Sequence, residues 1–375
     1  EHLRILFEKV LSNHDFKFNF KAYSKDVTEI VDSENGNRLF YPHISQQDFC
    51  KIPGSPIAYW LSHRTLDIFD KSKKIADHSP ARIGMMTSDN ERFLRNWFEV
   101  SRAKMTTKCN SIPDSIASKM KWFPYNKGGG FRKWYGMNEL VVNWENGGQE
   151  IVENGMTSFR GKQFYFKKGI TWSRINSGDF GVRYKDDGAI FDIQGSSFPD
   201  DSSLFYVIAF MNSSLVGSFI QILNPTSTFQ GGNINTLPFM YKPTKEIDDR
   251  TSQNISFSRQ DWDAHETSWD FVRNELLTMD ENVLFENINY HAEQHFKKTG
   301  EHICIDPAPP MPESVEWCYD MYCSKWERMF MQLHENEEEL NKLFISIYDV
   351  QGELNHTVQK EKITILQQGE ISIEN

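Results

Sequence analysis

Hydrophobic periodicity changes along this chain of 375 residues, and the change limits the folds that it can adopt. Between residues 122 and 197, short runs rich in aromatic and β-branched residues are separated by turns that contain glycine, as in a sheet of short strands. Between residues 317 and 350, apolar side chains recur every three or four residues and glutamates occupy the other face. That spacing predicts an amphipathic helix packed on a partner helix. We therefore expect an α+β protein, in which a mixed α/β domain of short twisted strands and flanking helices precedes a mainly helical region.

Apolar spacing and capping residues place the individual elements. Strands are expected at residues 140–144, 163–166, 169–172, 180–184 and 189–192, and one more from Phe16 onward. Helices are expected at residues 1–13, 57–69, 204–223 and 258–277, the last capped by Ser258, and from a Ser88-Asp89-Asn90 cap through Phe98. The resulting domains are residues 1–48, the trailing end of a preceding domain or a linker, then residues 49–245, and then a helical spacer at residues 246–375.

Length and composition allow a sizeable core, because 39% of the residues are hydrophobic. The longest apolar stretch, residues 204–223, is interrupted by polar residues, so we expect no membrane span. The five cysteines are odd in number and scattered, with no secretory signal ahead of them, which favours free thiols in the cytoplasm. Because the chain begins at Glu1 inside an expected helix, we expect it to be a fragment of a longer protein.

Charge is distributed unevenly along the chain. The formal net charge is −11. Residues 119–185 nevertheless carry twelve Lys and Arg against five Asp and Glu, a local net charge of +7. The densest acidic run lies far downstream, at Glu335, Glu337, Glu338 and Glu339. A basic region is therefore joined to an acidic one, and the basic region has the charge that a nucleic-acid partner requires.

One segment inside the basic region has an unusual composition. Residues 121–136 read K-W-F-P-Y-N-K-G-G-G-F-R-K-W-Y-G, with six aromatic residues, four cations and three consecutive glycines. Such a composition suits a surface that grips a phosphate backbone and stacks on bases. The alternative is a glycine turn between two strands, with Trp122, Phe123, Trp134 and Tyr135 half in the core.

Enzyme motifs are mostly absent from the sequence. His291 and His295 are spaced as zinc ligands could be, and His302 and Cys304 follow, but the order is not H-E-x-x-H and a solvated helix explains it. Asp192, Asp200 and Asp201 lie in turn-like sequence, and the three glycines are not followed by the Lys and hydroxyl residue of a nucleotide-binding loop. We therefore expect no catalytic residue and no metal site in this chain.

Several blocks, in order, carry a family resemblance. They read F-C-K-I-P-G-S-P-I-A-Y-W at 49–60, S-D-N-E-R-F-L-R at 88–95, the segment at 121–136, V-V-N-W-E-N-G-G at 141–148, G-I-T-W-S at 169–173, L-N-P-T-S-T-F-Q-G-G-N-I at 223–234 and D-W-D-A-H-E-T-S-W-D-F at 261–271. The chain thereby resembles the C-terminal region of PglX-type adenine-specific DNA methyltransferases. These are the modification enzymes of BREX phage-defence systems and are related to type IIG restriction-modification enzymes.

The resemblance implies that the catalytic part is missing from this chain. In the family, a Rossmann-like methyltransferase domain with an S-adenosylmethionine loop and an N-P-P-[YF] motif comes first. Neither motif occurs here, and Asn224-Pro225-Thr226-Ser227 lacks the second proline and the aromatic residue, so its expected role is structural. The resemblance thus implies a fragment without a cofactor of its own. Its parent would be a site-specific adenine methyltransferase that uses S-adenosylmethionine, and the N-terminal methyltransferase domain would be its partner.

The role that remains for residues 49–245 is target recognition on double-stranded DNA. Phosphate contacts are predicted at Lys127, Gly128, Gly129, Gly130, Arg132, Lys133, Lys167 and Lys168, where cations or bare backbone can approach the duplex. Base or groove contacts are predicted at Arg174, Asn176, Arg183 and Gln230, residue types that read guanine or adenine in the major groove.

Two other functions are considered. The acidic helical third could instead make the chain an interaction module that docks partner subunits of a defence complex, because a run of like charge can attract a basic partner. A self-contained nuclease has little support, because the sequence offers no convincing cluster of metal-binding carboxylates.

Overall fold

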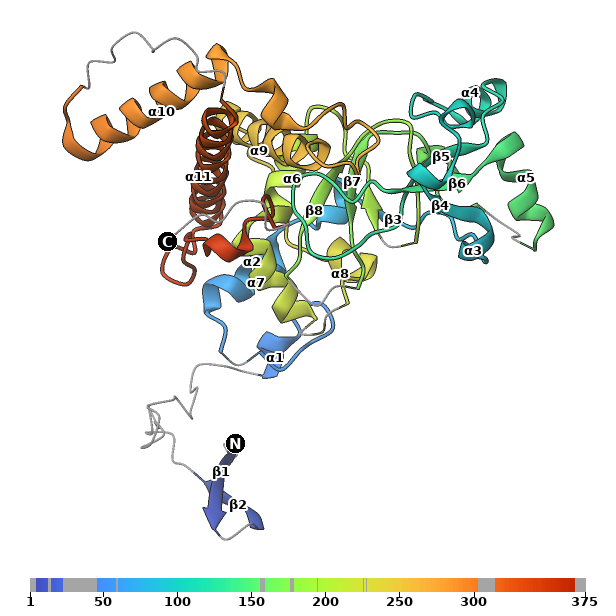
Figure 1. The fold of residues 1–375 in the computed structure, drawn as a ribbon. Helices are drawn as coiled ribbons and strands as arrows, with labels where there is room; N and C mark the ends of the chain where they lie inside the picture. Colours follow the sequence, from blue (N-terminus) through green and yellow to red (C-terminus); the bar gives the residue numbers. More distant parts are fainter. Residues whose placement is uncertain are drawn as a thin grey trace. The chain divides into compact units, whose positions relative to one another are not determined.

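The structure of the chain is a computed structural model. It describes residues 5–12, 15–22, 46–58, 60–155, 159–175, 179–193, 195–224, 226, 228–302 and 314–367. The chain divides into two compact units, residues 1–72 and 73–375, and each is described by itself. Helices and strands occur together throughout the second unit, which confirms the expected mixture of α and β elements (Figure 1). The predicted domain boundaries at residues 48 and 245 stay predictions.

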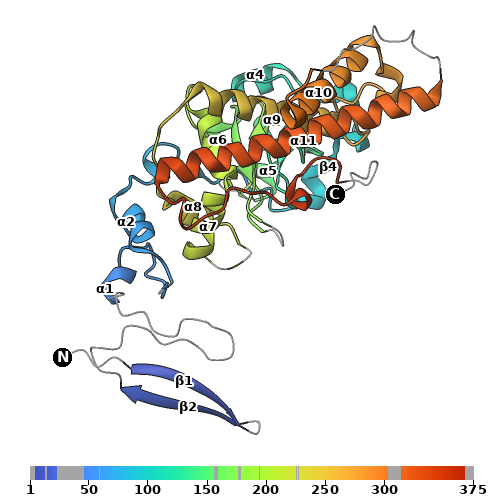
Figure 2. The same cartoon turned by 90° about the vertical axis from the view of Figure 1, so that its left-hand side faces the viewer.

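Among its described residues, the first unit contains a β-hairpin and two short helices. β1 (Ile5–Ser12) and β2 (Asp15–Ala22) are antiparallel, with Ile5 opposite Ala22 and Ser12 opposite Asp15 (Figure 2). The strand predicted from Phe16 is therefore confirmed, but the helix predicted at residues 1–13 is wrong. Its short apolar run fits a strand as well as a helix, and pairing with β2 satisfies the backbone as a strand.

The two helices of the first unit are α1 (Gln46–Phe49) and α2 (His63–Lys71). α2 begins six residues later than the predicted start at residue 57. The reason is the cap, because the Ser62 side chain accepts a hydrogen bond from the backbone N–H of Thr65 at 3.0 Å.

The second unit is built on two four-stranded sheets. The first has the order β3-β10-β7-β8 and is antiparallel, and the second has the order β4-β6-β5-β9, in which only the β5–β9 pair is parallel. The strands are β3 (Ala81–Arg82), β4 (Leu94–Asn96), β5 (Trp122–Asn126), β6 (Leu140–Asn143), β7 (Gly169–Trp172), β8 (Val182–Lys185), β9 (Ile190–Phe191) and β10 (Ser196–Ser197).

Four of the five strands predicted in this region are confirmed in place, with small differences at their ends. The strand predicted at residues 163–166 is wrong, because the chain there forms the 3-10 helix η4 (Lys162–Phe164). Gly161 precedes it with a φ of +65°, which turns the chain out of the extended conformation.

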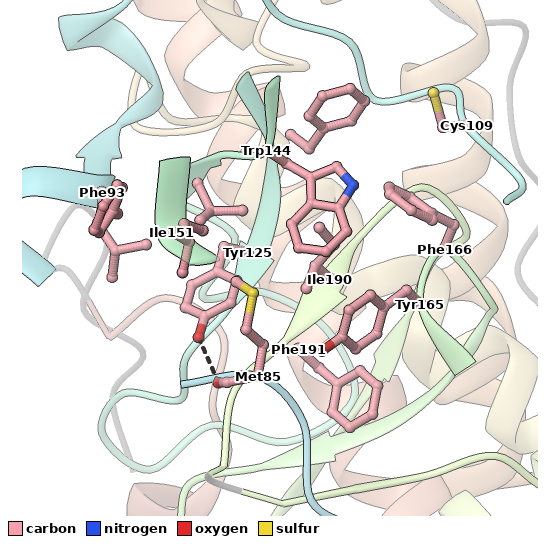
Figure 3. Close-up of a cluster of buried hydrophobic side chains, with 13 residues drawn as sticks. Met85, Phe93, Cys109, Tyr125, Trp144, Ile151, Tyr165, Phe166, Ile190 and Phe191 are labelled. Carbon is pink, nitrogen blue, oxygen red and sulfur yellow. Dashed lines mark hydrogen bonds between the residues drawn. The ribbon is translucent and has the colours of Figure 1, made fainter. Parts of the chain in front are cut away.

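A cluster of aromatic and aliphatic side chains fills the region around the second sheet (Figure 3). Tyr125 of β5 lies within it and donates a hydrogen bond to the backbone oxygen of Met85 at 2.9 Å, so its hydroxyl is satisfied in the core. Within residues 121–136, Phe123, Tyr125, Trp134 and Tyr135 are all at most 2% exposed. Burial of these four aromatic rings matches the structural alternative for this segment and leaves few rings free to stack on bases.

Short helices surround the sheets. They are η1 (Ile75–Asp77), α3 (Asn90–Phe93), η2 (Trp97–Glu99), η3 (Arg102–Lys104), α4 (Ile112–Ala117), α5 (Glu145–Glu153) and α8 (Gly231–Asn235). The predicted cap before α3 is confirmed, because the Asp89 side chain accepts from the N–H of Arg92. The predicted run through Phe98 is wrong, since the chain leaves the helix to pair Leu94 with Val142 in the sheet.

The helix predicted at residues 204–223 is two helices, α6 (Leu204–Asn212) and α7 (Ser214–Leu223), bent by 66°. Ser213 breaks the run and caps α7, and the N–H of Ser214 donates to the side-chain oxygen of Asn341 at 2.8 Å. Within the ranges described, no single helix is both long enough and apolar enough to cross a bilayer.

The last third of the chain is mainly helical. It comprises α9 (Lys245–Asp263), η5 (Glu275–Thr278), α10 (Glu281–Thr299), α11 (Val315–Tyr348) and η6 (Lys360–Lys362). α11 confirms the long helix predicted from periodicity. The helix predicted at residues 258–277 is wrong, because Thr244 caps α9 and Ser258 is buried inside it. α9 packs against α6 and α11, so these helices belong to the same unit as the sheets.

Candidate nucleic-acid interface

The three consecutive glycines lie in a loop that leaves the end of β5. We call residues 127–130 the glycine loop. Ser173, directly after β7, fixes this loop with two hydrogen bonds. The N–H of Gly129 donates to Ser173 Oγ at 3.0 Å, and Ser173 Oγ donates to the backbone oxygen of Gly130 at 3.1 Å. Gly129 and Gly130 are exposed, so the loop presents ordered bare backbone to solvent.

The loop conformation favours glycine at one position in particular. Gly128 has a φ of +88°, which L-residues rarely adopt. A Cβ atom on Gly129 would lie 2.4 Å from Met137 Sδ, at the flexible end of that side chain, so Met137 would have to move. The bare glycines leave the backbone where a ligand can approach it.

Two further predicted residues lie in segments joined to this loop. The backbone oxygen of Arg174, the residue after Ser173, accepts from the N–H of Phe229 at 2.6 Å. Gln230 follows Phe229, is exposed, and occupies the N-cap position of α8. We call the glycine loop, Arg174 and Gln230 the glycine-loop surface. Three segments that are distant in sequence are thus brought together.

Lys127, at the start of the loop, is partly exposed. Burial raises the pKa of Asp192, and the nearby charge of Lys127 opposes that rise. The charge of Lys127 is therefore felt at the Asp192 carboxylate, on the segment after β9.

Arg132 and Lys133, predicted to contact phosphates, have different roles in the structure. Arg132 Nη2 lies 2.7 Å from Asp261 Oδ2 of α9, and the two side chains are 8% and 4% exposed. Lys133 Nζ lies 2.7 Å from Glu337 Oε2 of α11, with exposures of 12% and 3%. These ion pairs hold the segment to the helices. We therefore revise the prediction, because neither cation is presented to solvent.

Trp134 adds to the same attachment. Its indole N–H donates to Glu337 Oε1 at 2.7 Å, so one carboxylate binds two consecutive side chains of the segment. Trp134 has a φ of +68°. Backbone hydrogen bonds between Trp134 and the two residues on either side of Arg183 in β8 hold that conformation. The second half of the segment is thus fixed between β8 and α11.

Arg183, predicted as a base contact, is 1% exposed. Its guanidinium donates to Ser173 Oγ at 3.3 Å and to the backbone oxygen of Arg132 at 3.5 Å. Burial, and secondarily the charge of Arg132, lowers the pKa of Arg183 to about 10. The side chain supports Ser173 from beneath the surface, which is a revised role. Asn176 lies outside the described residues.

Lys167 and Lys168 lie at the opposite end of β7 from Ser173. Five residues of extended chain separate Lys168 from Ser173, or roughly 16 Å. Lys167 is exposed, and Lys168 Nζ pairs with Asp201 Oδ2 at 2.9 Å. The predicted phosphate contacts are therefore divided between two places, and only the glycine loop adjoins Arg174 and Gln230.

Sequence reasoning missed the residue that organises this surface. Ser173 is buried and bonds Gly129, Gly130 and Arg183 through one hydroxyl. Ser173 belongs to the block G-I-T-W-S. That block predicted a strand and contributed to the family resemblance, but it did not indicate this role. No group of three or more metal-binding side chains occurs within the described parts of the chain, and Cys304 lies outside them.

Comparison with known proteins gives two informative relatives. The chain is 37% identical over 362 residues to the adenine-specific methyltransferase PglX of Lacticaseibacillus casei (strain Zhang), covering 94% of this chain and 28% of that protein. It is 34% identical over 290 residues to the adenine-specific methyltransferase BrxX of Escherichia coli O9:H4 (strain HS), covering 75% of this chain and 23% of that protein. No family model matches the chain.

Over 94% of its length the chain is thus similar to a part of a PglX-type protein. It spans about a quarter of the length of these relatives. The match confirms the resemblance found in the sequence blocks.

Proposed function

We propose that this chain is the DNA target-recognition part of a site-specific adenine methyltransferase of a phage-defence system. The observation that carries the proposal is the glycine-loop surface. Residue types suited to phosphate and base contacts come from three separate segments and lie side by side, on an ordered backbone held by Ser173. The two relatives are named adenine-specific methyltransferases, which supports the choice of DNA as the ligand.

Methylation of a base in duplex DNA explains why such a surface is needed. The target base must leave the stack and enter a catalytic pocket, so another part of the protein has to hold the duplex and fix its register. The backbone N–H groups and Lys127 of the glycine loop would contact phosphates, and Arg174 and Gln230 would contact base edges. S-adenosylmethionine would bind the methyltransferase domain, which is not part of this chain.

The alternative, a module that docks partner subunits through its acidic helix, loses its motivation. Each glutamate of the dense run in α11 has a partner within the chain. Glu337 binds Lys133 and Glu338 accepts from the N–H of Val358. Glu335 lies 3.8 Å from Lys297, and Glu339 lies 3.3 Å from Lys342. Glu337 and Glu338 therefore hold neighbouring chain to α11, whereas Glu335 and Glu339 form exposed pairs at the surface.

Binding of the chain to duplex DNA across a salt series tests the proposal. Affinity should fall as salt rises, and Lys127→Gln should reduce the slope of log affinity against log salt by about 0.9, as expected for one lost phosphate contact. The matched control is Lys298→Gln at the end of α10, another exposed cation, which should leave the slope unchanged. Affinity that does not depend on salt would reject the proposal.

A further inference from the structure

An exposed isoleucine lies between cations at the edge of the first sheet. Ile83, directly after β3, is 51% exposed. Arg82 and Lys162 are both exposed beside it. The segment of Lys162 adjoins Ile83, because a Cβ on Gly161 would lie 2.8 Å from the Ile83 backbone oxygen. The apolar Ile83 side chain is thus exposed to solvent near two exposed cations.

The backbone on both sides of Ile83 is fixed. Before it, Arg82 pairs with Ser196 of β10 in the first sheet. After it, the N–H of Gly84 donates to the backbone oxygen of Asp192 at 3.2 Å, and that of Met85 to the oxygen of Phe191 at 2.8 Å. A Cβ on Gly84 would lie 2.0 Å from the Phe191 oxygen, so only glycine permits this approach. Ile83 is therefore held on a rigid bridge between the two sheets.

The Arg82 side chain is also held in place. Its guanidinium carbon lies 5.0 Å from the centre of the Phe164 ring, and that ring stacks on Phe198 with centres 4.8 Å apart. Stacking on an aromatic face orients a guanidinium and reduces the entropy lost when it binds a phosphate or a base. Arg82 and Ile83 thus form an ordered pair, one cationic and one apolar.

This pair adjoins the glycine-loop surface. The N–H of Ala81 donates to the Asn235 side-chain oxygen of α8 at 2.7 Å, and a Cβ on Gly231 would lie 3.3 Å from the Ala81 Cβ. Gly231 directly follows Gln230. Across the sheet, Arg82 and Thr171 are two strand spacings apart, or about 10 Å. Thr171 lies two residues before Ser173, which fixes the glycine loop, so the Arg82–Ile83 pair and the glycine-loop surface are joined through the same sheet.

We propose that Ile83 is an apolar wedge that enters the minor groove and partly unstacks a base step, with Arg82 and Lys162 beside it on the DNA backbone. This inference rests on the proposed function. Minor-groove proteins insert single apolar side chains between base steps, flanked by cations, and the inserted side chain kinks the duplex. A kink next to the recognised site would assist extrusion of the target base, because it weakens the stacking that extrusion must overcome.

The test uses a duplex of about 30 base pairs with a central TA step, which kinks easily, and with energy-transfer dyes at its ends. Wild-type chain should bend this duplex. Ile83→Ala should abolish the bend and weaken binding about tenfold, with the salt slope unchanged, because no charge is lost. Ile83→Met keeps an apolar side chain of similar size and should retain the bend.

The matched control is Ile116→Ala on α4, because Ile116 is 47% exposed and has no part in the proposal. Equal effects of the two alanine variants, or a bend that persists in Ile83→Ala, would overturn the wedge. Salt-dependent binding of wild-type chain without a bend would also overturn it and leave the proposed function standing. If wild-type affinity does not depend on salt, both proposals fail.

Discussion

Two parts of the segment at residues 121–136, the glycine loop and the residues that follow it, differ more than their composition suggests. The glycine loop is partly or fully exposed and is hydrogen-bonded to Ser173. Arg132 and Lys133, a few residues later, lie in largely buried ion pairs with α9 and α11. Cations of one segment thus divide into Lys127, which is partly exposed, and two that attach the segment internally. Composition alone does not distinguish the two, because a cation near solvent and a cation near a carboxylate have the same side chain.

The stability of the protein should be more sensitive to substitution at the internal attachment, formed by Arg132 and Lys133, than at the glycine loop. Asp261→Ala leaves the Arg132 guanidinium buried without its carboxylate and removes the acceptor for the N–H of Leu366. Loss of one partner from a buried ion pair should lower the free energy of unfolding by about 3–5 kcal/mol, measured by urea denaturation.

The control for Asp261→Ala is Asp249→Ala, which breaks a pair with Lys245 at 3.4 Å. Its two side chains are 90% and 64% exposed. An exposed pair should contribute at most about 1 kcal/mol. If the two variants lost equal stability, Arg132 would not be an internal attachment.

Lys185 is a buried lysine that, unlike Arg132 and Lys133, hydrogen-bonds to backbone oxygens and not to a carboxylate. It is 1% exposed and donates to the backbone oxygens of Lys167 and Asp186. Burial lowers the pKa of its ammonium group to about 7, from an ordinary value of 10.5. Between these two values the unfolded chain holds a proton that the folded chain has lost, so this group makes stability rise with pH from about 7 to 10.5.

Lys185→Met removes this titration. Its free energy of unfolding should rise less steeply with pH over that range than that of the wild-type chain, as measured by urea denaturation at several pH values. Identical pH profiles for the two proteins would show that Lys185 keeps its proton when folded.

The smallest expected effect on stability lies in the glycine loop. Gly128→Ala places a side chain at a φ of +88° and should lower the free energy of unfolding by about 1 kcal/mol. Gly130→Ala is the matched control, because it needs no positive φ and its Cβ would meet only Met137 Cε, at 3.7 Å. Thermal unfolding of both variants measures the difference. If Gly130→Ala were the more damaging, the loop would not depend on the conformation of Gly128.

The sequence correctly predicted those helices and strands whose own residues carry the full periodic pattern. β7 (Gly169–Trp172) matched its predicted range, and α11 matched to within two residues at each end. The failures came where a distant or earlier residue decides the outcome. Ser258 is a residue type that often caps helices, but α9 begins earlier, with Thr244 as its N-cap. The backbone oxygen of Ser258 instead accepts a hydrogen bond from Arg132.

The candidate site shows the same division. Glycines that can bring backbone close to a phosphate, and Arg and Gln types that can read bases, were visible in the sequence. The place where they meet was not visible, because the hydroxyl that joins Gly129 and Gly130 belongs to Ser173, directly after β7 and more than forty residues away. Arg82 precedes Ile83 in the sequence, but the exposure of Ile83 and the approach of the Lys162 segment to it appear only in the fold.

By itself, the sequence determined the mixture of strands and helices, the basic region and the resemblance to PglX-type proteins, because periodicity, local charge and ordered blocks are written along the chain. Only the tertiary structure decided which cations remain for a ligand. The carboxylates that pair with Arg132 and Lys133 come from 129 and 204 residues away in the chain. Electrostatic pairing and burial depend on distance in space, and the fold sets that distance.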